Sequence, residues 1–338
     1  MPMQQKGFSL LSLTQTASQH KLSNQNIFSM SYEGKMLEDF AMPTRKEVEQ
    51  VLLKTLFKHN GVIKEFATGE EIVNEIADKF SLNNNQRTAV LERIYRKENR
   101  IVKTPLWHRL LYRAADSLAK EKLVSKPTST ILLTNKKEWM LTENGFDEAL
   151  KLLNIPQSQK EFLQTKSYEV QKIAKKLIET PRPENYNPFD NEKKVVKVTR
   201  ESAIRTRGFR QAVIEAYNYK CAFCGLKINS LKDMSWGVEA AHIVPHSEKG
   251  KDDILNGLSL CRLHHWAFDA GWFAVENNFT IQVSSKVNSL SSDFGKMGDY
   301  DFIRIFSNKK IKMLLPQNKE IYPHQSAISW HRENKFYH

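Results

Sequence analysis

The sequence predicts an α+β fold in two parts, a mostly helical N-terminal part and a C-terminal part with short strands and a helix that carries histidines. Three observations support this division. Apolar residues recur at helical spacing from Pro43 onward, all cysteines lie between residues 221 and 261, and a polar stretch with several prolines separates the two regions. A chain of 338 residues is also longer than one hydrophobic core usually serves.

These observations define four segments. Residues 1–42 are polar and rich in Ser, Gln and Asn, and we expect a loosely ordered N-terminal extension there. Residues 43–155 form the helical domain, and residues 156–199 add a connecting helix and an exposed linker. Residues 200–338 form the second domain.

The helical domain has recognisable start signals. Thr44 precedes the first apolar repeat, and Thr68 followed by Glu71 has the spacing of a capping box. We expect helices at 44–61, 68–82, 86–95, 104–127 and 144–153. Two short runs of strand type, 129–134 and 138–142, are expected to pair around a turn at 135–137. Helices followed by a two-stranded ribbon are the layout of a winged helix-turn-helix.

The long helix and the ribbon of this domain are basic. Residues 93–126 contain many more Lys and Arg than Asp and Glu, which is the charge pattern of a phosphate-binding face. We therefore expect a DNA-binding surface, with the long helix in a major groove and with Lys136 and Lys137 at the tip of the wing, where they meet the backbone or a minor groove. The residues expected to contact DNA are Arg109, Arg113, Lys136 and Lys137. A solvated helical bundle used for protein contacts is the alternative.

Part of this domain resembles the N-terminal domain of the Mrr family of restriction proteins. The resemblance rests on "MPTRKEVEQVLLKTL", "WHRLLYRAADSLAKEKLVSKP" and "EWMLTENGFDEAL", and it spans residues 42–153. It implies a winged helix that binds DNA.

The composition narrows the class of protein. Lys and Arg number 51 against 38 Asp and Glu, and the net charge of +13 is typical of a chain that associates with polyanions, with a merely solubilising surface as the alternative. No apolar run approaches the roughly 20 residues of a membrane span, and the N-terminus lacks the pattern of a signal peptide. We expect no membrane association and a cytoplasmic location. An odd number of cysteines argues against a disulfide framework and fits that compartment.

The cysteines have the spacing of metal ligands. "CAFC" contains Cys221 and Cys224, and "CRLH" repeats the spacing with Cys261 and His264. Structural zinc takes four thiolate or imidazole ligands, commonly from two such short loops. We therefore expect one structural Zn²⁺ bound by these four residues. The alternative is three buried free thiols beside an unrelated histidine.

A second set of polar residues is interleaved with the cysteines. The short strand "GVEAAHI" carries His242, a polar loop carries Asn256, and a helix carries His265. Neighbouring residues on a helix point about 100° apart, so His265 faces a different site from His264. Each residue alone is commonly just a satisfied polar group, but the ordered set indicates a second site.

These motifs resemble the HNH endonucleases of bacterial restriction type, whose core is a ββα-metal finger. The resemblance rests on "RGFRQAVIEAYNYKCAFCGL", "EAAHIVPHSEKGKDDILNGLSLC", "HHWAFDAGWFAV" and "SAISWHRENKF", and it spans residues 200–338. It implies that His242 is the general base and that Asn256 holds the turn bearing this base. It also implies that His265 binds a catalytic divalent metal, Mg²⁺ or Mn²⁺.

One position departs from the family pattern. Many HNH nucleases have an acid or a histidine immediately before the base, where this chain has Ala241. Glu239 is the nearest carboxylate, but on a strand it projects to the face opposite His242, so we expect an indirect or structural role. Asp269, four residues after His265 on one helix face, is expected to bind the metal. A turn role for Asp269 before Gly271 is the alternative.

Together these features predict a restriction-type endonuclease that hydrolyses double-stranded DNA. One HNH domain cuts one strand, so a double-strand break implies a homodimer or two successive nicks. A restriction role implies a cognate DNA methyltransferase as a partner. Two alternatives stay open: an endonuclease that requires methylated DNA, and a catalytically inactive DNA-binding regulator.

Overall fold

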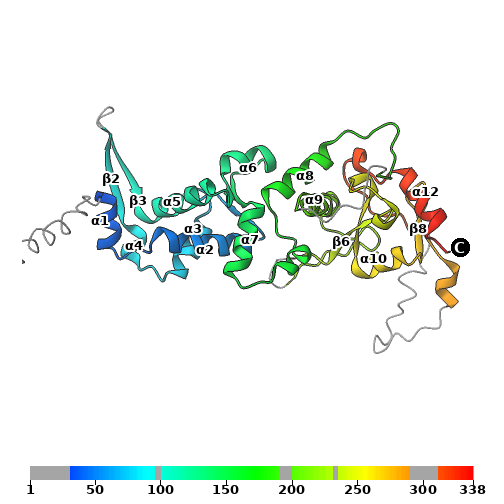
Figure 1. The fold of residues 1–338 in the computed structure, drawn as a ribbon, viewed down its shortest axis with the longest axis horizontal. Coiled ribbons are helices and arrows are strands. Elements are labelled where there is room, and N and C mark those ends of the chain that lie inside the picture. Colours follow the sequence, from blue (N-terminus) through cyan, green and yellow to red (C-terminus); the bar gives the residue numbers. More distant parts are fainter. Residues whose placement is uncertain (1–30, 96–99, 191–199, 231–234, 290–310, 338) are drawn as a thin grey trace, which may run out of the picture. The chain divides into compact units, whose positions relative to one another are not determined.

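The computed structural model describes residues 31–95, 100–190, 200–230, 235–289 and 311–337 (Figure 1). The chain divides into two compact units, one of residues 1–43 and 83–107 and the other of residues 44–82 and 108–338. Most of the expected N-terminal extension, up to residue 30, lies outside the described residues. Among the helices that the structure describes, none has the length and apolar composition of a membrane span.

The first unit is a β-hairpin with short helices. Its elements are α1 (Tyr32–Asp39), α4 (Asn84–Thr88), β2 (Val90–Tyr95) and β3 (Arg100–Pro105). The two strands pair antiparallel, and buried Ala89, Leu91 and Leu106 pack against Leu37 and Phe40. The helix expected at 86–95 is therefore wrong beyond its first residues. The strand partner comes from a separate segment, which local periodicity does not reveal.

The second unit starts with helices around a small sheet. Its first elements are α2 (Arg45–Lys58), β1 (Val62–Lys64), α3 (Glu70–Lys79), α5 (Leu106–Lys120, which begins in the first unit), β4 (Val124–Ser125), α6 (Pro127–Thr134), β5 (Glu138–Leu141) and α7 (Glu143–Leu152). The sheet is antiparallel with the order β1-β5-β4. Leu52, Leu56, Met140 and Phe146 are fully buried in this part.

The two predicted capping signals had different outcomes. Thr44 caps α2, because its hydroxyl accepts from the Glu47 N–H at 3.3 Å while the Glu47 carboxylate accepts from the Thr44 N–H at 2.8 Å. The capping box at Thr68 is wrong. Helix α3 follows Gly69 without a side-chain cap, and the Thr68 hydroxyl donates to the carbonyl of Glu65 instead.

The strand expected at 129–134 is also wrong, because this segment is helix α6. Pro127 lies in its first turn, where the missing N–H of proline removes no hydrogen bond, and Asn135 ends it with a left-handed φ of 58°. The second expected strand is present as β5, which pairs with β1 and β4. Lys136 and Lys137 therefore lie between a helix and a strand and not at the tip of a two-stranded wing.

Helices α8 (Tyr168–Glu179) and α9 (Arg200–Ala216) pack side by side and are preceded by the 3-10 helix η1 (Gln157–Phe162) (Figure 1). A Cβ atom at Gly208 would lie 2.4 Å from Cγ2 of Ile173, so glycine permits this close approach. The connecting helix that the sequence predicts is therefore packed on the first helix of the C-terminal part.

One buried and one half-buried ion pair fix α9 to the helical part of the same unit. Arg207 on α9 donates to Glu143 at 2.5 Å, and both side chains are almost fully buried. Glu215, near the end of α9, accepts from Lys166 at 2.7 Å. These pairs couple the position of α9 to the segments before it.

The C-terminal part contains the elements predicted for the site. They are β6 (Val238–His242), β7 (Gly257–Cys261), α10 (Arg262–Asp269), β8 (Phe273–Val275), β9 (Ile281–Val283) and α12 (Gln325–Asn334), with 3-10 helices η2 (His246–Glu248), η3 (Ile254–Asn256), η4 (Ser285–Ser289) and η6 (Lys319–Ile321). Strands β6 and β7 pair antiparallel, and α9 and α10 both contact them. Their shared core includes Phe209, Val213, Leu258 and Phe268. The strand and the helix that carry the two histidines are thus confirmed.

Candidate active site and metal centre

The three cysteines and His264 converge in the structure. Their ligand atoms all lie within 4.8 Å of one another, and Cys224 is the exposed member. Cys221 and Cys224 lie on a turn after α9 that is attached to β7 by the bond from the Ala222 N–H to the Ser259 carbonyl, 2.7 Å long. Cys261 immediately precedes α10, so the first turn of this helix brings His264 to the same point.

The chemistry of this cluster suits a cation. Nδ1 of His264 faces the sulfur atoms, 3.0 Å from Cys261 and 3.7 Å from Cys221. Burial alone lowers the pKa of His264, but contact with the three cysteines outweighs burial and raises the pKa to about 11. Three sulfurs and one imidazole nitrogen form a possible metal site that is compatible with structural zinc.

His242 lies at the end of β6 with its ring held on two sides. Phe209 of α9 stacks on the imidazole, with ring centroids 4.2 Å apart and planes at 23°. Nε2 of His242 lies 2.9 Å from Oδ1 of Asp252, whose side chain is only 3% exposed. The Thr206 hydroxyl donates to the other oxygen of Asp252 at 3.2 Å. The orientation of this imidazole is therefore set by both a ring and a carboxylate.

Asn256 is fully buried and bonds to the segment that follows His242. Its Oδ1 accepts from the Val244 N–H at 2.9 Å, and its Nδ2 donates to the carbonyls of Val244 and Lys251 at 3.1 and 3.0 Å. These bonds close the loop between β6 and β7. This is the geometry that a turn-holding asparagine requires.

His265 points to a different place from His264, as the helical spacing requires. Its Nδ1 lies 3.0 Å from Oε2 of Glu239 on β6, and its Nε2 lies 3.5 Å from Oδ2 of Asp269 one helical turn later. Contact with His265 lowers the pKa of Glu239 against the opposing effect of burial. Burial raises the pKa of Asp269, and the nearby charges of His265 and His242 oppose this. Asp269 therefore lies in the electrostatic range of both histidines.

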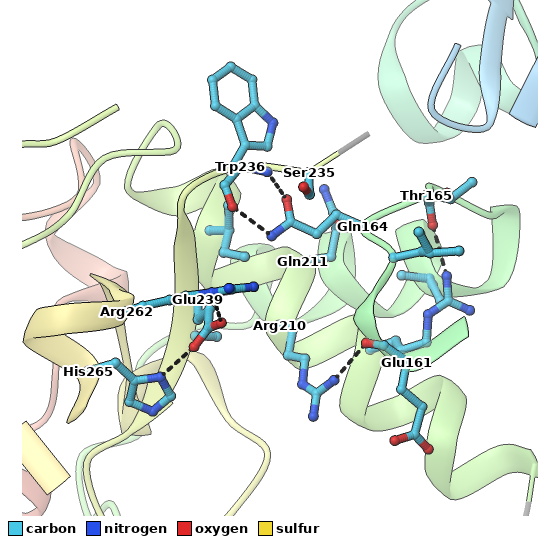
Figure 2. A pocket seen from close by; sticks show the side chains of 15 residues that line it. Glu161, Gln164, Thr165, Arg210, Gln211, Ser235, Trp236, Glu239, Arg262 and His265 are labelled. Atoms are coloured by element: carbon cyan, nitrogen blue, oxygen red, sulfur yellow. Dashed lines mark hydrogen bonds and ion pairs between the residues drawn. The ribbon is translucent and has the colours of Figure 1, made fainter. Parts of the chain in front are cut away.

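A cavity of about 300 Å³ adjoins His265 (Figure 2). Its lining includes Arg210, Trp236, Glu239 and Arg262. Arg262 donates to the second oxygen of Glu239 at 3.0 Å, so one carboxylate is shared between an arginine and the candidate metal-binding histidine. The exposed guanidinium groups of Arg210 and Arg262 make this surface suited to an anion.

The residues predicted to contact DNA lie in the helical part. Arg113 on α5 is exposed and Arg109 is half-buried, while Lys136 and Lys137 are exposed after α6. Arg113 also lines a surface depression of about 400 Å³. Its lining is completed by Arg45, Asp116, Ser117 and Lys120. Their contact with DNA stays a prediction.

Sequence reasoning missed two residues at the histidine site. The sequence pattern assigns no role to Asp252 in the polar loop after β6 or to Phe209 on α9. An acidic pair in the loop between the two predicted histidine-bearing elements was the available signal for Asp252. No local signal identifies Phe209, because it is an ordinary apolar position on its helix.

Comparison with known families addresses the same segment. Residues 221–276 match the HNH endonuclease family. This HNH segment runs from the first cysteine through β6, β7 and α10, and it contains every predicted zinc ligand together with His242, Asn256 and His265. The chain therefore contains an HNH endonuclease domain.

Two other comparisons add little. No curated protein sequence matches the chain. One solved structure, described as a modification dependent TagI restriction endonuclease, matches with a TM-score of 0.26 and 19% identity. The match covers 37% of this chain and 36% of that one, so the chain spans about a third of that protein's length. A likeness this low does not bear on the activity of this chain.

Proposed function

We propose that this protein is a metal-dependent endonuclease that hydrolyses phosphodiester bonds of double-stranded DNA. The observation that carries the proposal is the set of His242, Asn256 and His265 within the HNH segment. Strand β6 and helix α10, which carry the two histidines, contact each other, and Asn256 at the end of η3 is hydrogen-bonded to Val244 just after His242. His242 has one face packed and keeps 17% of its side chain exposed, as a base that meets substrate requires.

The catalytic metal would be held on α10. A metal-binding histidine usually gives its other ring nitrogen to a carboxylate, which fixes the ring. Glu239 takes that part at Nδ1 of His265, so Nε2 and the neighbouring Asp269 carboxylate are the proposed ligands. A bound Mg²⁺ or Mn²⁺ supplies neutralisation of the charge that develops on the phosphate and on the leaving 3′ oxygen.

His242 is the proposed general base. It takes a proton from the attacking water, and Asn256 keeps the turn after His242 in place. The products are 5′-phosphate and 3′-hydroxyl ends. The proposed role of the zinc cluster, formed by Cys221, Cys224, Cys261 and His264, is structural, because it joins the turn after α9 to the start of α10.

DNA recognition is proposed for the helical part. The elements α2, β1, α3, α5, β4 and β5, with an antiparallel sheet of order β1-β5-β4, support a winged-helix arrangement. Two insertions interrupt this order: α4, β2 and β3 lie between α3 and α5, and α6 precedes the last strand. Helix α5 would then be the recognition helix. The proposed DNA contacts are Arg109, Arg113, Lys136 and Lys137.

The proposal also includes a biological role for this protein in DNA restriction. It includes a homodimer or two successive nicks for a double-strand break, a cytoplasmic location, and a cognate methyltransferase unless the target must itself be methylated. Incubation of methylated and unmethylated plasmid with Mg²⁺ or Mn²⁺ tests the cutting and its dependence on methylation. Cutting of the unmethylated plasmid alone indicates a restriction enzyme whose host DNA is protected by a methyltransferase. Cutting of the methylated plasmid alone indicates an endonuclease that requires methylated DNA. Binding of both forms without cutting of either, with intact zinc, would leave the inactive DNA-binding regulator as the function.

A further inference from the structure

The loop between β6 and β7 places a buried carboxylate against the proposed base. Oδ1 of Asp252 lies 2.9 Å from Nε2 of His242. An ionised carboxylate only accepts hydrogen bonds, so Nε2 must carry the proton of the neutral imidazole. Among the described residues, Nδ1 of His242 has no hydrogen-bond partner. Nδ1 is therefore the nitrogen with a free lone pair.

The carboxylate is itself positioned by α9. The Thr206 hydroxyl donates to Oδ2 of Asp252 at 3.2 Å, and Nε of Arg205 lies 3.6 Å from the same oxygen. With only 3% of its side chain exposed, Asp252 has little freedom to turn away. Phe209, from the same helix, restricts the imidazole ring by stacking. One helix thus fixes both the base and its carboxylate partner.

We propose that Asp252 is a positioning residue that holds His242 in the Nε2–H tautomer, so that Nδ1 is the atom that takes the proton from water. This inference rests on the proposed nuclease function and deepens it. In the step, an O–H bond of water breaks and its proton goes to Nδ1. The water oxygen forms a bond to phosphorus, the bond from phosphorus to the 3′ oxygen breaks with its electron pair on that oxygen, and the oxygen takes a proton from solvent.

Asp252 has a second effect in this step. When Nδ1 takes the proton, the ring becomes an imidazolium beside a carboxylate that is already hydrogen-bonded to it. Among the described residues, the other charged or titratable groups facing His242 are His246, with ring centroids 6.2 Å apart, and Asp269 on α10. Arg205 acts through Asp252. Asp252 is thus the charged group in direct contact with the ring.

The variant Asp252→Asn separates positioning from packing. Asparagine has nearly the same shape, but its amide can donate to Nε2 and so favour the Nδ1–H tautomer, which cannot accept the proton. We expect cutting to fall by at least about 100-fold while DNA affinity stays within a few-fold. Loss of the negative charge also makes the imidazolium less stable. The acid limb of the pH–rate profile should therefore move to lower pH, which a purely structural defect would not cause.

Asp253→Asn is the matched control. Asp253 accepts the Leu255 N–H at 2.9 Å as the cap of η3, and asparagine caps equally well. This neighbour should keep the cutting rate of the unaltered protein. If Asp252→Asn cuts with the rate and pH profile of the unaltered protein, Asp252 does not position the base.

Nitrogen NMR of the full-length protein gives a readout that does not depend on cutting. Histidines are labelled with ¹⁵N, and the His242 signals are assigned by their loss in His242→Ala. The Nε2–H tautomer at neutral pH supports the proposal, and the Nδ1–H tautomer overturns it, even if Asp252→Asn does not fold. If the protein cuts no DNA, the proposed nuclease function fails, while this measurement still decides what Asp252 does.

Discussion

Glu239 and His265 come from different elements and meet at 3.0 Å between Oε2 and Nδ1. The strand pattern predicts an indirect role for Glu239, because Glu239 and His242 project to opposite faces of the strand. In the structure Glu239 contacts His265, whereas His242 contacts Asp252. Glu239 is thus placed to orient the proposed metal ligand and not to assist the proposed base. The side chain in this position also stays ionised, since contact with His265 lowers its pKa.

The first prediction concerns this orientation. Glu239→Gln should weaken Mn²⁺ or Mg²⁺ binding about 10- to 100-fold, because the amide holds the ring less firmly and makes its other nitrogen a weaker ligand. Metal titration of the cutting rate, together with calorimetric titration of Mn²⁺, measures the change. Glu320→Gln, an exposed carboxylate on η6, is the control. Unchanged metal affinity in Glu239→Gln would remove Glu239 from the metal site.

The zinc cluster gives the second prediction. The purified protein should contain one zinc per chain, and Cys221→Ser or strong chelation should unfold the C-terminal part, since structural zinc contributes on the order of 10 kcal/mol. Elemental analysis and thermal unfolding check this. Lys220→Ser, at an exposed position directly before the cluster, would control for the substitution. A folded, active preparation with less than half an equivalent of zinc would contradict the assignment.

The motif residues could be located from the sequence because their spacing is local. Cys261, His264 and His265 lie within one turn of a helix, so their directions follow from 3.6 residues per turn. Asp252 and Phe209 could not be assigned, since their contact with His242 depends on how α9 and the loop pack. Such contacts are set by tertiary structure and leave no periodic signal.

The errors in the helical part have a different origin. Residues 129–134 are apolar and β-branched enough to suggest a strand, but Pro127 and Asn135 start and end a helix there. The hairpin at 90–105 depends on a partner strand that helical spacing does not reveal.

Packing of α8 on α9 has a practical consequence for fragments of the protein. A fragment that starts at residue 200 lacks α8 and would expose the face of α9 that α8 covers.

The third prediction concerns the base. His242→Ala should reduce cutting at least about 1000-fold, because proton transfer and the carboxylate contact are both lost, while DNA affinity changes within a few-fold. His246→Ala, in the neighbouring turn, should retain most activity. Cutting assays and binding titrations with one duplex measure both quantities. A parallel loss of binding and cutting in His242→Ala would mean that His242 is structural.

The fourth prediction concerns acid stability. His331 on α12 is 2% exposed and stacks on Phe268 with ring centroids 3.6 Å apart. Its Nε2 is hydrogen-bonded to the Phe268 carbonyl at 3.1 Å. Burial lowers its pKa to about 4. The unfolded chain takes up this proton near pH 6.5, whereas the folded protein does not until the pH is much lower. The stability contribution is therefore present above pH 6.5 and is lost as the pH falls toward 4.

His331→Gln keeps a donor for the carbonyl but cannot titrate. Between pH 7.5 and 5 the unaltered protein should lose about 2 kcal/mol more unfolding free energy than this variant. Urea unfolding at the two pH values measures the difference. Zinc release is common to both proteins and cancels in the comparison. An equal loss in both would show that His331 binds its proton in the folded state as readily as in the unfolded chain.

The last prediction separates the part that binds DNA from the part that cuts it. Arg113 on α5 and Lys136 and Lys137 after α6 are exposed cations that lie outside the HNH segment. If they contact phosphates, each Ala substitution should weaken binding to all duplexes alike and reduce the log–log salt slope by about one unit. Lys319→Ala, an exposed lysine on η6, should leave the slope unchanged. Cutting at saturating DNA should persist in every variant, because the base and the proposed metal ligands are unaltered. If the salt slope stays the same when Arg113, Lys136 and Lys137 are all replaced by Ala in one variant, DNA binds elsewhere on the chain.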